Sequence, residues 1–269
     1  MTHRRVGLAS LMLAGLLIGV LVPRAEAVTI LTLQDGFGAG PYAGTRDTFL
    51  NEDGQDEDHG TDTELELRDK SAKREVPLIF FDLTGQIPAG QDILSAVLTL
   101  EKEAGSTSNL TVTAYRVTAG AWSEGDGNDS TAGHADWNHR IHSSTTWPGG
   151  DFSSAAYTTT DSASTVVSAD GTYNWTVTDI VEPWYLGTNP NYGFALVGSS
   201  GHDKTIKFWS SEQTTSSLPS SLRPKLTITY QALGGGGAGT IVPEPMSLLL
   251  VGLGGLGMFG ARLTGRRSA

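Results

Sequence analysis

The sequence predicts an all-β fold: an antiparallel β-sandwich of the jelly-roll type, with an N-terminal signal peptide and a C-terminal transmembrane sorting helix. Short runs of alternating or continuously apolar residues recur between clusters of Gly, Asp, Ser and Pro. Only one segment has helical character, and strands do not alternate with helices, which argues against a parallel sheet. Both ends of the chain carry an apolar run beside basic residues.

Residues 1–27 have the three parts of a secretory signal peptide. A basic stretch at residues 3–5 precedes an apolar core at Val6–Val22, and Ala25 and Ala27 form a small-x-small cleavage site. We therefore expect an exported protein whose mature chain begins near Val28. The alternative is an uncleaved N-terminal anchor.

Residues 28–231 form a segment long enough for one domain with a proper core. The formal net charge of the whole chain is −11, and the basic residues at the two ends make this segment more acidic still. Such a surface repels phosphate backbones, so we expect no nucleic-acid partner. The chain contains no cysteine, which excludes disulfides, thiol nucleophiles and thiolate metal sites.

The expected strands are short and mostly alternate in polarity, as in Leu110–Val117, where every second residue can face a core. The full set is Val28–Leu33, Glu64–Arg68, Leu78–Leu83, Ile93–Glu101, Leu110–Val117, Thr172–Val177, Phe194–Gly198, Thr205–Ser210 and Lys225–Tyr230.

Three segments depart from the strand pattern. Asp179–Trp184 is the expected helix, with Asp179 as its N-cap and Glu182 closing a capping box. Residues 51–62 form an acidic loop. Residues 123–163 are rich in Gly, Ser, Thr, Asp and Trp, and a loop of that length is usually functional or disordered.

The order of several short phrases across residues 28–231 resembles the DNRLRE domain. The phrases are Tyr42–Thr48, Leu65–Arg68 at the place of the name-giving motif, Phe80–Leu83, Ile87–Gly90, Ile93–Leu100, Trp122–Gly127 with Trp137, Trp147–Phe152, Tyr173–Val181, Asn189–Phe194, Lys207–Glu212 and Arg223–Tyr230. The resemblance implies a jelly-roll accessory or surface module without catalytic activity. Some members of that family are carbohydrate-binding modules.

The polar middle loop holds our candidate carbohydrate site. Sugar recognition commonly uses an exposed aromatic face with polar groups beside it. Trp122, Trp137 and Trp147 lie in or beside this loop, near Arg140 and Asp151. The alternative is that these tryptophans are structural.

The acidic loop holds our candidate calcium site, because Ca²⁺ takes six to eight oxygen ligands from carboxylates and carbonyls. The alternative is a solvated acidic loop, and a weaker second candidate is the segment Glu124–Asp129. The predicted ligands are Glu52, Asp53, Asp56, Asp58 and Asp62.

Carboxylates and histidines of the middle loop also suit catalysis or metal binding. The loop has enough carboxylates for an acid/base pair, at Glu124, Asp126, Asp129 and Asp136. However, Asp in a Gly-rich loop more often forms turns. Nearby, His134, His139 and His142 match no closed zinc spacing, so we interpret them as exposed loop residues. We therefore expect no enzymatic activity.

The C-terminal residues follow a Gly-rich linker at residues 232–241. Pro243, Glu244 and Pro245 precede the apolar run Met246–Gly260, and Arg262, Arg266 and Arg267 end it. Extended to Leu263, the run makes a short membrane span that leaves the main domain outside the cytoplasm. Residues 242–269 resemble the PEP-CTERM sorting signal of exported Gram-negative proteins, which implies cleavage by an exosortase-type enzyme after transient anchoring in the inner membrane.

These features together predict an exported, non-catalytic protein of the cell envelope or extracellular matrix that binds polysaccharide through its sandwich domain. One alternative is a structural or adhesive component of the exopolysaccharide matrix, without defined sugar specificity. A second alternative is a polysaccharide lyase or hydrolase. The expected partners are polysaccharide or other matrix components and the processing enzyme.

Overall fold

The computed structural model describes residues 27–36, 41–199, 201–213 and 219–233. Contacts along the chain define two units, residues 1–233 and 234–269, and only the first contains described residues. The predicted signal-peptide core with Ala25, and the sorting segment with Pro243, Glu244, Pro245, Arg262, Arg266 and Arg267, lie outside the described residues. In the described part of the chain, no helix has the length and apolar character needed to cross a membrane.

The described residues are almost wholly β, with a single α-helix, as predicted. The elements are β1 (Val28–Leu33), β2 (Thr45–Asn51), β3 (Glu64–Asp69), β4 (Glu75–Phe81), β5 (Gln91–Gly105), β6 (Leu110–Val117), β7 (His139–Ile141), β8 (Thr145–Thr146), β9 (Tyr157–Val167), β10 (Gly171–Thr176), α1 (Thr178–Tyr185), β11 (Phe194–Gly198), β12 (His202–Trp209), the 3-10 turn η1 (Ser220–Leu222) and β13 (Lys225–Ala232).

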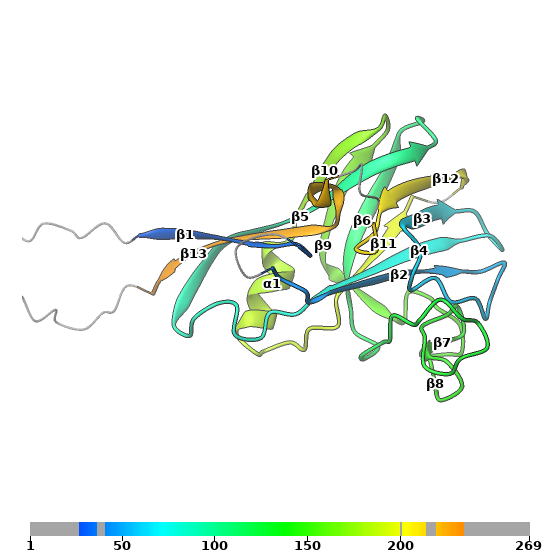
Figure 1. The fold of residues 1–269 in the computed structure, drawn as a ribbon, viewed down its shortest axis with the longest axis horizontal. Coiled ribbons are helices and arrows are strands. Elements are labelled where there is room, and N and C mark those ends of the chain that lie inside the picture. Colours follow the sequence, from blue (N-terminus) through cyan, green and yellow to red (C-terminus); the bar gives the residue numbers. More distant parts are fainter. Residues whose placement is uncertain (1–26, 37–40, 200, 214–218, 234–269) are drawn as a thin grey trace, which may run out of the picture. The chain divides into compact units, whose positions relative to one another are not determined.

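Eleven of the described strands form one antiparallel sheet that curls on itself, and β7 and β8 form a separate two-stranded sheet (Figure 1). One group, called here the first sheet, runs in the order β1-β13-β5-β12-β3, with β10 on the other edge of β5. The second sheet contains β4-β11-β6-β9, with β2 on the other edge of β4. The two sheets join where β3 pairs with β4, at Arg68 and Glu75. The result is a sandwich whose core lies between them.

The main core combines alternate residues of both sheets. Leu98 and Leu100 of β5 and Phe208 of β12 pack in the same cluster as Phe81 of β4 and Phe194 of β11. Indole Nε1 of Trp175 on β10 donates across the sandwich to the carbonyl of Val112 on β6, at 2.9 Å. Apolar side chains that alternate along each strand therefore meet inside the sandwich.

Strand β4 is buried on both of its faces. Ile79 and Phe81 face the main core, whereas Val76 and Leu78 belong to a second hydrophobic cluster. That cluster includes Leu50 of β2, on the same second sheet. The outer face of this sheet is therefore covered, and the residues that cover it come from the long middle loop.

Most predicted strands are confirmed, and Val28–Leu33, Leu110–Val117 and Phe194–Gly198 have the predicted bounds. Two long strands, β2 and β9, were not predicted. Strand β9 consists largely of Ser, Thr and Ala at the edge of the second sheet, so it lacks an apolar alternation. Strand β2 carries charged residues next to apolar ones.

The predicted capping box of the helix is wrong. Helix α1 begins at Thr178, and no side chain caps its first turn. The Thr178 hydroxyl accepts instead a hydrogen bond from the Ala96 amide of β5, at 3.0 Å. The helix packs on the sandwich through Ile180, Val181 and Trp184, and this burial stabilises it in place of the cap.

Candidate functional site

The middle loop is folded as a third layer over the second sheet. We call residues 118–156 the covering loop. It contains the short hairpin β7–β8, drawn in green below β2 in the view of Figure 1. The residues that it contributes to the second hydrophobic cluster are Trp122, Ala135, Trp137, Trp147, Phe152 and Ala156.

The three tryptophans of the predicted carbohydrate site are buried. Trp122 is 4% exposed, and Trp137 and Trp147 are each 1% exposed. The Trp122 and Trp147 indoles donate to the backbone carbonyls of Tyr192 and Asp136, each at 2.8 Å. The prediction that these rings form an exposed platform for sugar is wrong, because their faces pack against the second sheet and each other.

The two polar residues of the same prediction have other surroundings. The Arg140 guanidinium donates to the carbonyl of Ala121 at 2.9 Å, within the covering loop. Asp151 is exposed and precedes the buried Phe152. Without an exposed aromatic ring between them, Arg140 and Asp151 do not make a sugar site of the predicted kind.

The acidic loop does not gather its five predicted calcium ligands at one point. The Glu52 carboxylate binds Arg74 by two side-chain hydrogen bonds of 3.0 and 2.8 Å. The Asp62 carboxylate bonds the His59 ring at 2.8 Å, while Asp53 is exposed. The single shared site of Glu52, Asp53, Asp56, Asp58 and Asp62 is therefore wrong, because the loop uses most of these carboxylates in separate contacts.

Asp58 joins the acidic loop to the covering loop. Its buried carboxylate accepts hydrogen bonds from the backbone amides of Gly60, Asp126, Gly127 and Asn128. Amide hydrogens that point at a carboxylate occupy the lone pairs that a cation would need. The segment Glu124–Asp129, our second calcium candidate, is thus hydrogen-bonded to Asp58 through its backbone amides.

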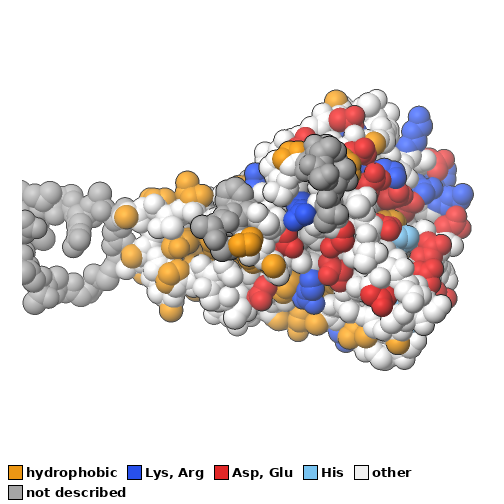
Figure 2. Space-filling view, in the orientation of Figure 1, with side chains coloured by type: hydrophobic (Ala, Val, Ile, Leu, Met, Phe, Trp, Pro, Cys, Tyr) orange, Lys and Arg blue, Asp and Glu red, His pale blue; other side chains and the backbone are white. Residues whose placement is uncertain are grey.

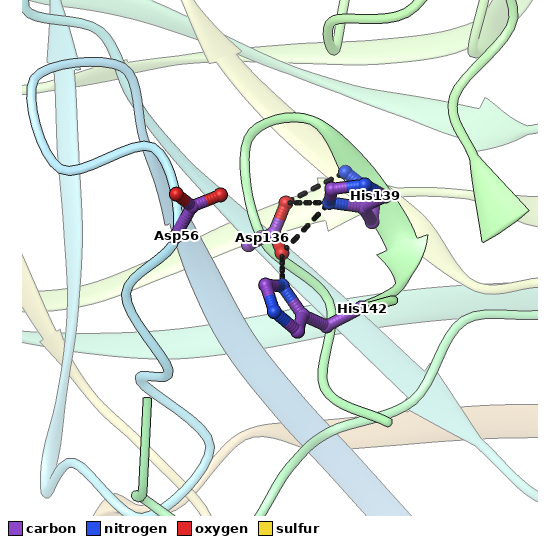
Figure 3. A group of neighbouring side chains, drawn as sticks. All are labelled: Asp56, Asp136, His139 and His142. Atoms are coloured by element: carbon purple, nitrogen blue, oxygen red, sulfur yellow. Dashed lines mark hydrogen bonds and ion pairs between the residues drawn. The ribbon is translucent and has the colours of Figure 1, made fainter. Parts of the chain in front are cut away.

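The histidines of the covering loop gather around the buried carboxylate of Asp136 (Figure 3). The His139 and His142 rings each direct Nδ1 at this carboxylate, at 3.0 Å from Oδ1 and 2.5 Å from Oδ2 respectively. His134 is 1% exposed and stacks on His142, with ring centroids 4.5 Å apart. The interpretation of these histidines as exposed is wrong.

The Asp136 cluster has the donors of a metal site but is already satisfied as a hydrogen-bonded network. Asp56, Asp136, His139 and His142 bring ligand atoms within 4.8 Å of one another, a nitrogen and oxygen set that suits zinc. However, Asp136 Oδ1 also accepts the amides of Asn138 and His139, at 2.8 and 2.6 Å. The network stabilises the buried carboxylate and fixes the turn that precedes β7.

A second group of converging acids was not predicted. Glu124 accepts the Asp47 backbone amide at 2.6 Å, and the two side chains meet Glu212, which follows β12. Burial, with the Glu212 charge as the next cause, raises the pKa of Asp47 well above its ordinary value. Burial raises the pKa of Glu124 to about 7. Asp47 and Glu212 lie far from Glu124 in the chain, so no local spacing could reveal the group.

An open cavity of about 660 Å³ lies beside α1, at the C-terminal end of β4. It combines aromatic and polar groups, which is the composition of many small-ligand sites. The Tyr185 hydroxyl is fixed by the Pro88 carbonyl and the Gln91 amide, each at 2.8 Å. The residues that line the cavity include Phe80, Asp82, Gln91, Tyr185, Leu186 and Asn191.

Comparison of the chain with models of known protein families and with curated proteins finds no match.

Proposed function

We propose that the chain is an exported, non-catalytic component of the cell envelope or exopolysaccharide matrix, in which a jelly-roll domain of the DNRLRE type acts as a structural or adhesive module. The observation that carries the proposal is the packing of the covering loop. Its three tryptophans stabilise a third layer, so the longest loop of the domain is part of the scaffold. No exposed aromatic platform remains on this loop to define a sugar specificity.

Features of the sequence support the proposed location of the protein in the cell envelope or matrix. The Ala25 and Ala27 site favours export, and the Pro243–Pro245 motif with its apolar run and basic end favours exosortase-type sorting. The domain surface is also uneven: acidic side chains gather over the part where β3 and β12 lie, and hydrophobic ones lie towards β1 and β13 (Figure 2). An acidic, hydroxyl-rich surface suits a hydrated matrix in which divalent cations link polyanions.

The test is retention of the purified full-length protein on a panel of immobilised acidic and neutral polysaccharides. A structural module should show weak retention on acidic polymers that rises with divalent cation and does not saturate. Size analysis of each polymer after long incubation tests the lyase or hydrolase alternative, and the proposal expects intact polymer. Shortened polymer, or saturable retention on one polymer alone, would contradict it.

The cavity beside α1 favours a second candidate, binding of a short polysaccharide segment. Leu186 lines this cavity and is 57% exposed, so Leu186→Asp would place a charge in its mouth without disturbing the core. If the cavity binds sugar, wild-type protein is retained selectively and Leu186→Asp is not. Val166→Asp is the matched control, because Val166 is similarly exposed, at 54%, on the edge strand β9, which does not line the cavity.

A further inference from the structure

Three carboxylates from three separate segments converge at one point of the fold. Asp47 lies on β2, Glu124 in the covering loop, and Glu212 just after β12. One ligand atom from each of them lies within 4.8 Å of the other two. The second sheet, the covering loop and the end of a first-sheet strand therefore meet at this group of acids, which we call the carboxylate triad.

The triad leaves buried oxygen atoms without hydrogen-bond partners among the described residues. Asp47 is 1% exposed; its Oδ2 accepts the Ser211 amide at 2.9 Å, but its Oδ1 has no partner. Glu212 Oε2 is likewise buried and unpartnered, although Oε1 accepts the Ser211 hydroxyl at 2.9 Å. A buried carboxylate oxygen without a partner is costly, so Asp47 and Glu212 need either a proton shared between them or a bound group that the protein itself does not supply.

A third buried oxygen lies on the same side of β2. Thr45 is two residues before Asp47, so strand alternation places both side chains on one face. Thr45 is 7% exposed, and its hydroxyl has no hydrogen-bond partner among the described residues. This face of β2 thus presents a hydroxyl and a carboxylate oxygen that are both desolvated and unused.

The nearby cation does not neutralise the triad. The Arg46 guanidinium lies 4.2 Å from the centre of the Phe80 ring, on the opposite face of β2 from Asp47. At Glu124 the largest charge effect is the repulsion from Glu212; the attraction of Arg46 is smaller and is opposed in turn by the charge of Asp35. Three acids in one partly desolvated place therefore need protons or a bound cation, because like charges at this separation repel strongly.

The donor chemistry selects the cation. The triad supplies oxygen atoms alone, and oxygen ligands suit hard cations, whereas zinc sites in proteins favour nitrogen and sulfur. Calcium accepts six to eight oxygens in irregular arrangements, while Mg²⁺ demands a near-ideal octahedron. We propose that Asp47, Glu124 and Glu212 bind one calcium ion, which fastens β2, the covering loop and the segment after β12 to one another.

The test begins with the full-length wild-type protein after removal of divalent cations by chelator. Calorimetric titration with CaCl₂ should show one site per chain. Thermal unfolding should show a melting temperature about 5–10 °C higher in calcium at 100 times the dissociation constant than in chelator. The absence of both stoichiometric binding and a calcium-dependent shift in the wild type would overturn the proposal, and this measurement needs no variant.

Variants then locate the ion. Asp47→Asn and Glu212→Gln preserve side-chain shape but remove a charge, so each should weaken calcium binding at least about 10-fold and abolish most of the shift in melting temperature. In chelator, each variant should melt at or above the wild-type temperature, because one repulsive charge is gone. The matched control is Asp203→Asn, which removes a carboxylate that lies on β12 and is 57% exposed. Calcium binding that survives Asp47→Asn unchanged would overturn the assignment.

Discussion

At the scale of single residues, buried carboxylates fasten the loops of this domain. Asp58 accepts four backbone amides, three of them from the covering loop, and its own amide donates to Asp129 at 2.7 Å. Asp136 holds the turn that leads into β7 by the same kind of contact. Both residues belong to acidic or polar stretches, where the sequence favours solvated charges or calcium.

Asp58→Ala should lower the free energy of unfolding by at least about 3 kcal/mol. Each hydrogen bond to a charged acceptor contributes about 1.5–3 kcal/mol, and the substitution also leaves buried amides unpartnered. Urea denaturation measures the change. Asp53→Ala is the control, since Asp53 is exposed in the same loop and should change stability by less than about 0.5 kcal/mol. Equal effects of the two substitutions would show that Asp58 does not hold the loops.

His59 should stabilise the fold at low pH and lose this contribution as pH rises, which is the opposite of what a buried neutral histidine does. Burial lowers its pKa, but the carboxylates of Asp62 and Glu57 outweigh burial and raise the net pKa above 6.5. Its contribution is therefore complete below about pH 6.5 and is lost as pH rises through the raised value. The difference in free energy of unfolding between wild type and His59→Gln should shrink from pH 6 to pH 8.5 in urea titrations. A difference that grows with pH would show that the ring is neutral in the fold.

At the scale of elements, Trp137 tests the covering loop as a layer. It is 1% exposed and packs near Phe152, with the Arg74 guanidinium 4.8 Å from the centre of its ring. Trp137→Ala should cost about 3–5 kcal/mol, as for other buried aromatic residues. Near-UV circular dichroism and urea denaturation measure the loss. The control is Trp209→Ala, which should cost less stability because Trp209 on β12 is only half-buried. A loss below about 1 kcal/mol would mean that the loop packs loosely.

The element scale also shows what the sequence could predict. Leu110–Val117 alternates cleanly and was predicted to the residue, whereas β9 lacks that signal because its Ser and Thr side chains suit either a loop or an edge strand. The sequence left two roles open for the tryptophans of the covering loop, an exposed sugar platform or a structural role, and their burial confirms the second. Burial there depends on the outer face of β4, whose Val76 and Leu78 alternate with core residues. Local spacing carries no information on such a distant partner, and the same holds for the carboxylate triad.

At the scale of the whole molecule, the two hydrophobic clusters share the second sheet. Strand β4 contributes to both, and so do β6 and β11. Loss of the covering loop would expose one face of these strands to water and weaken their packing on the first sheet.

We therefore expect residues 28–233 to unfold in one cooperative transition within the full chain. Tryptophan fluorescence reports on the covering loop through Trp122, Trp137 and Trp147, and on the rest of the domain through Trp175, Trp184 and Trp209. Far-UV circular dichroism reports on the strands, so the two thermal curves should coincide. Trp137→Ala should lower the common midpoint without separating the curves. An additional fluorescence step, at lower temperature than the loss of β signal and absent for the tryptophans outside the loop, would show that the covering loop is an independent unit.

The position of β13 has a mechanical consequence. This last strand lies between β1 and β5 and pairs with both along its length, from Leu226 opposite Leu33 to Gln231 opposite Val28 on one side. A pulling force applied at Leu233 along the strand axis would load these hydrogen bonds together in shear, rather than one after another as in peeling. Resistance to forced unfolding depends on the rate of unfolding under load, so we expect this pairing to slow the unfolding of the domain when a load acts through its C-terminal strand.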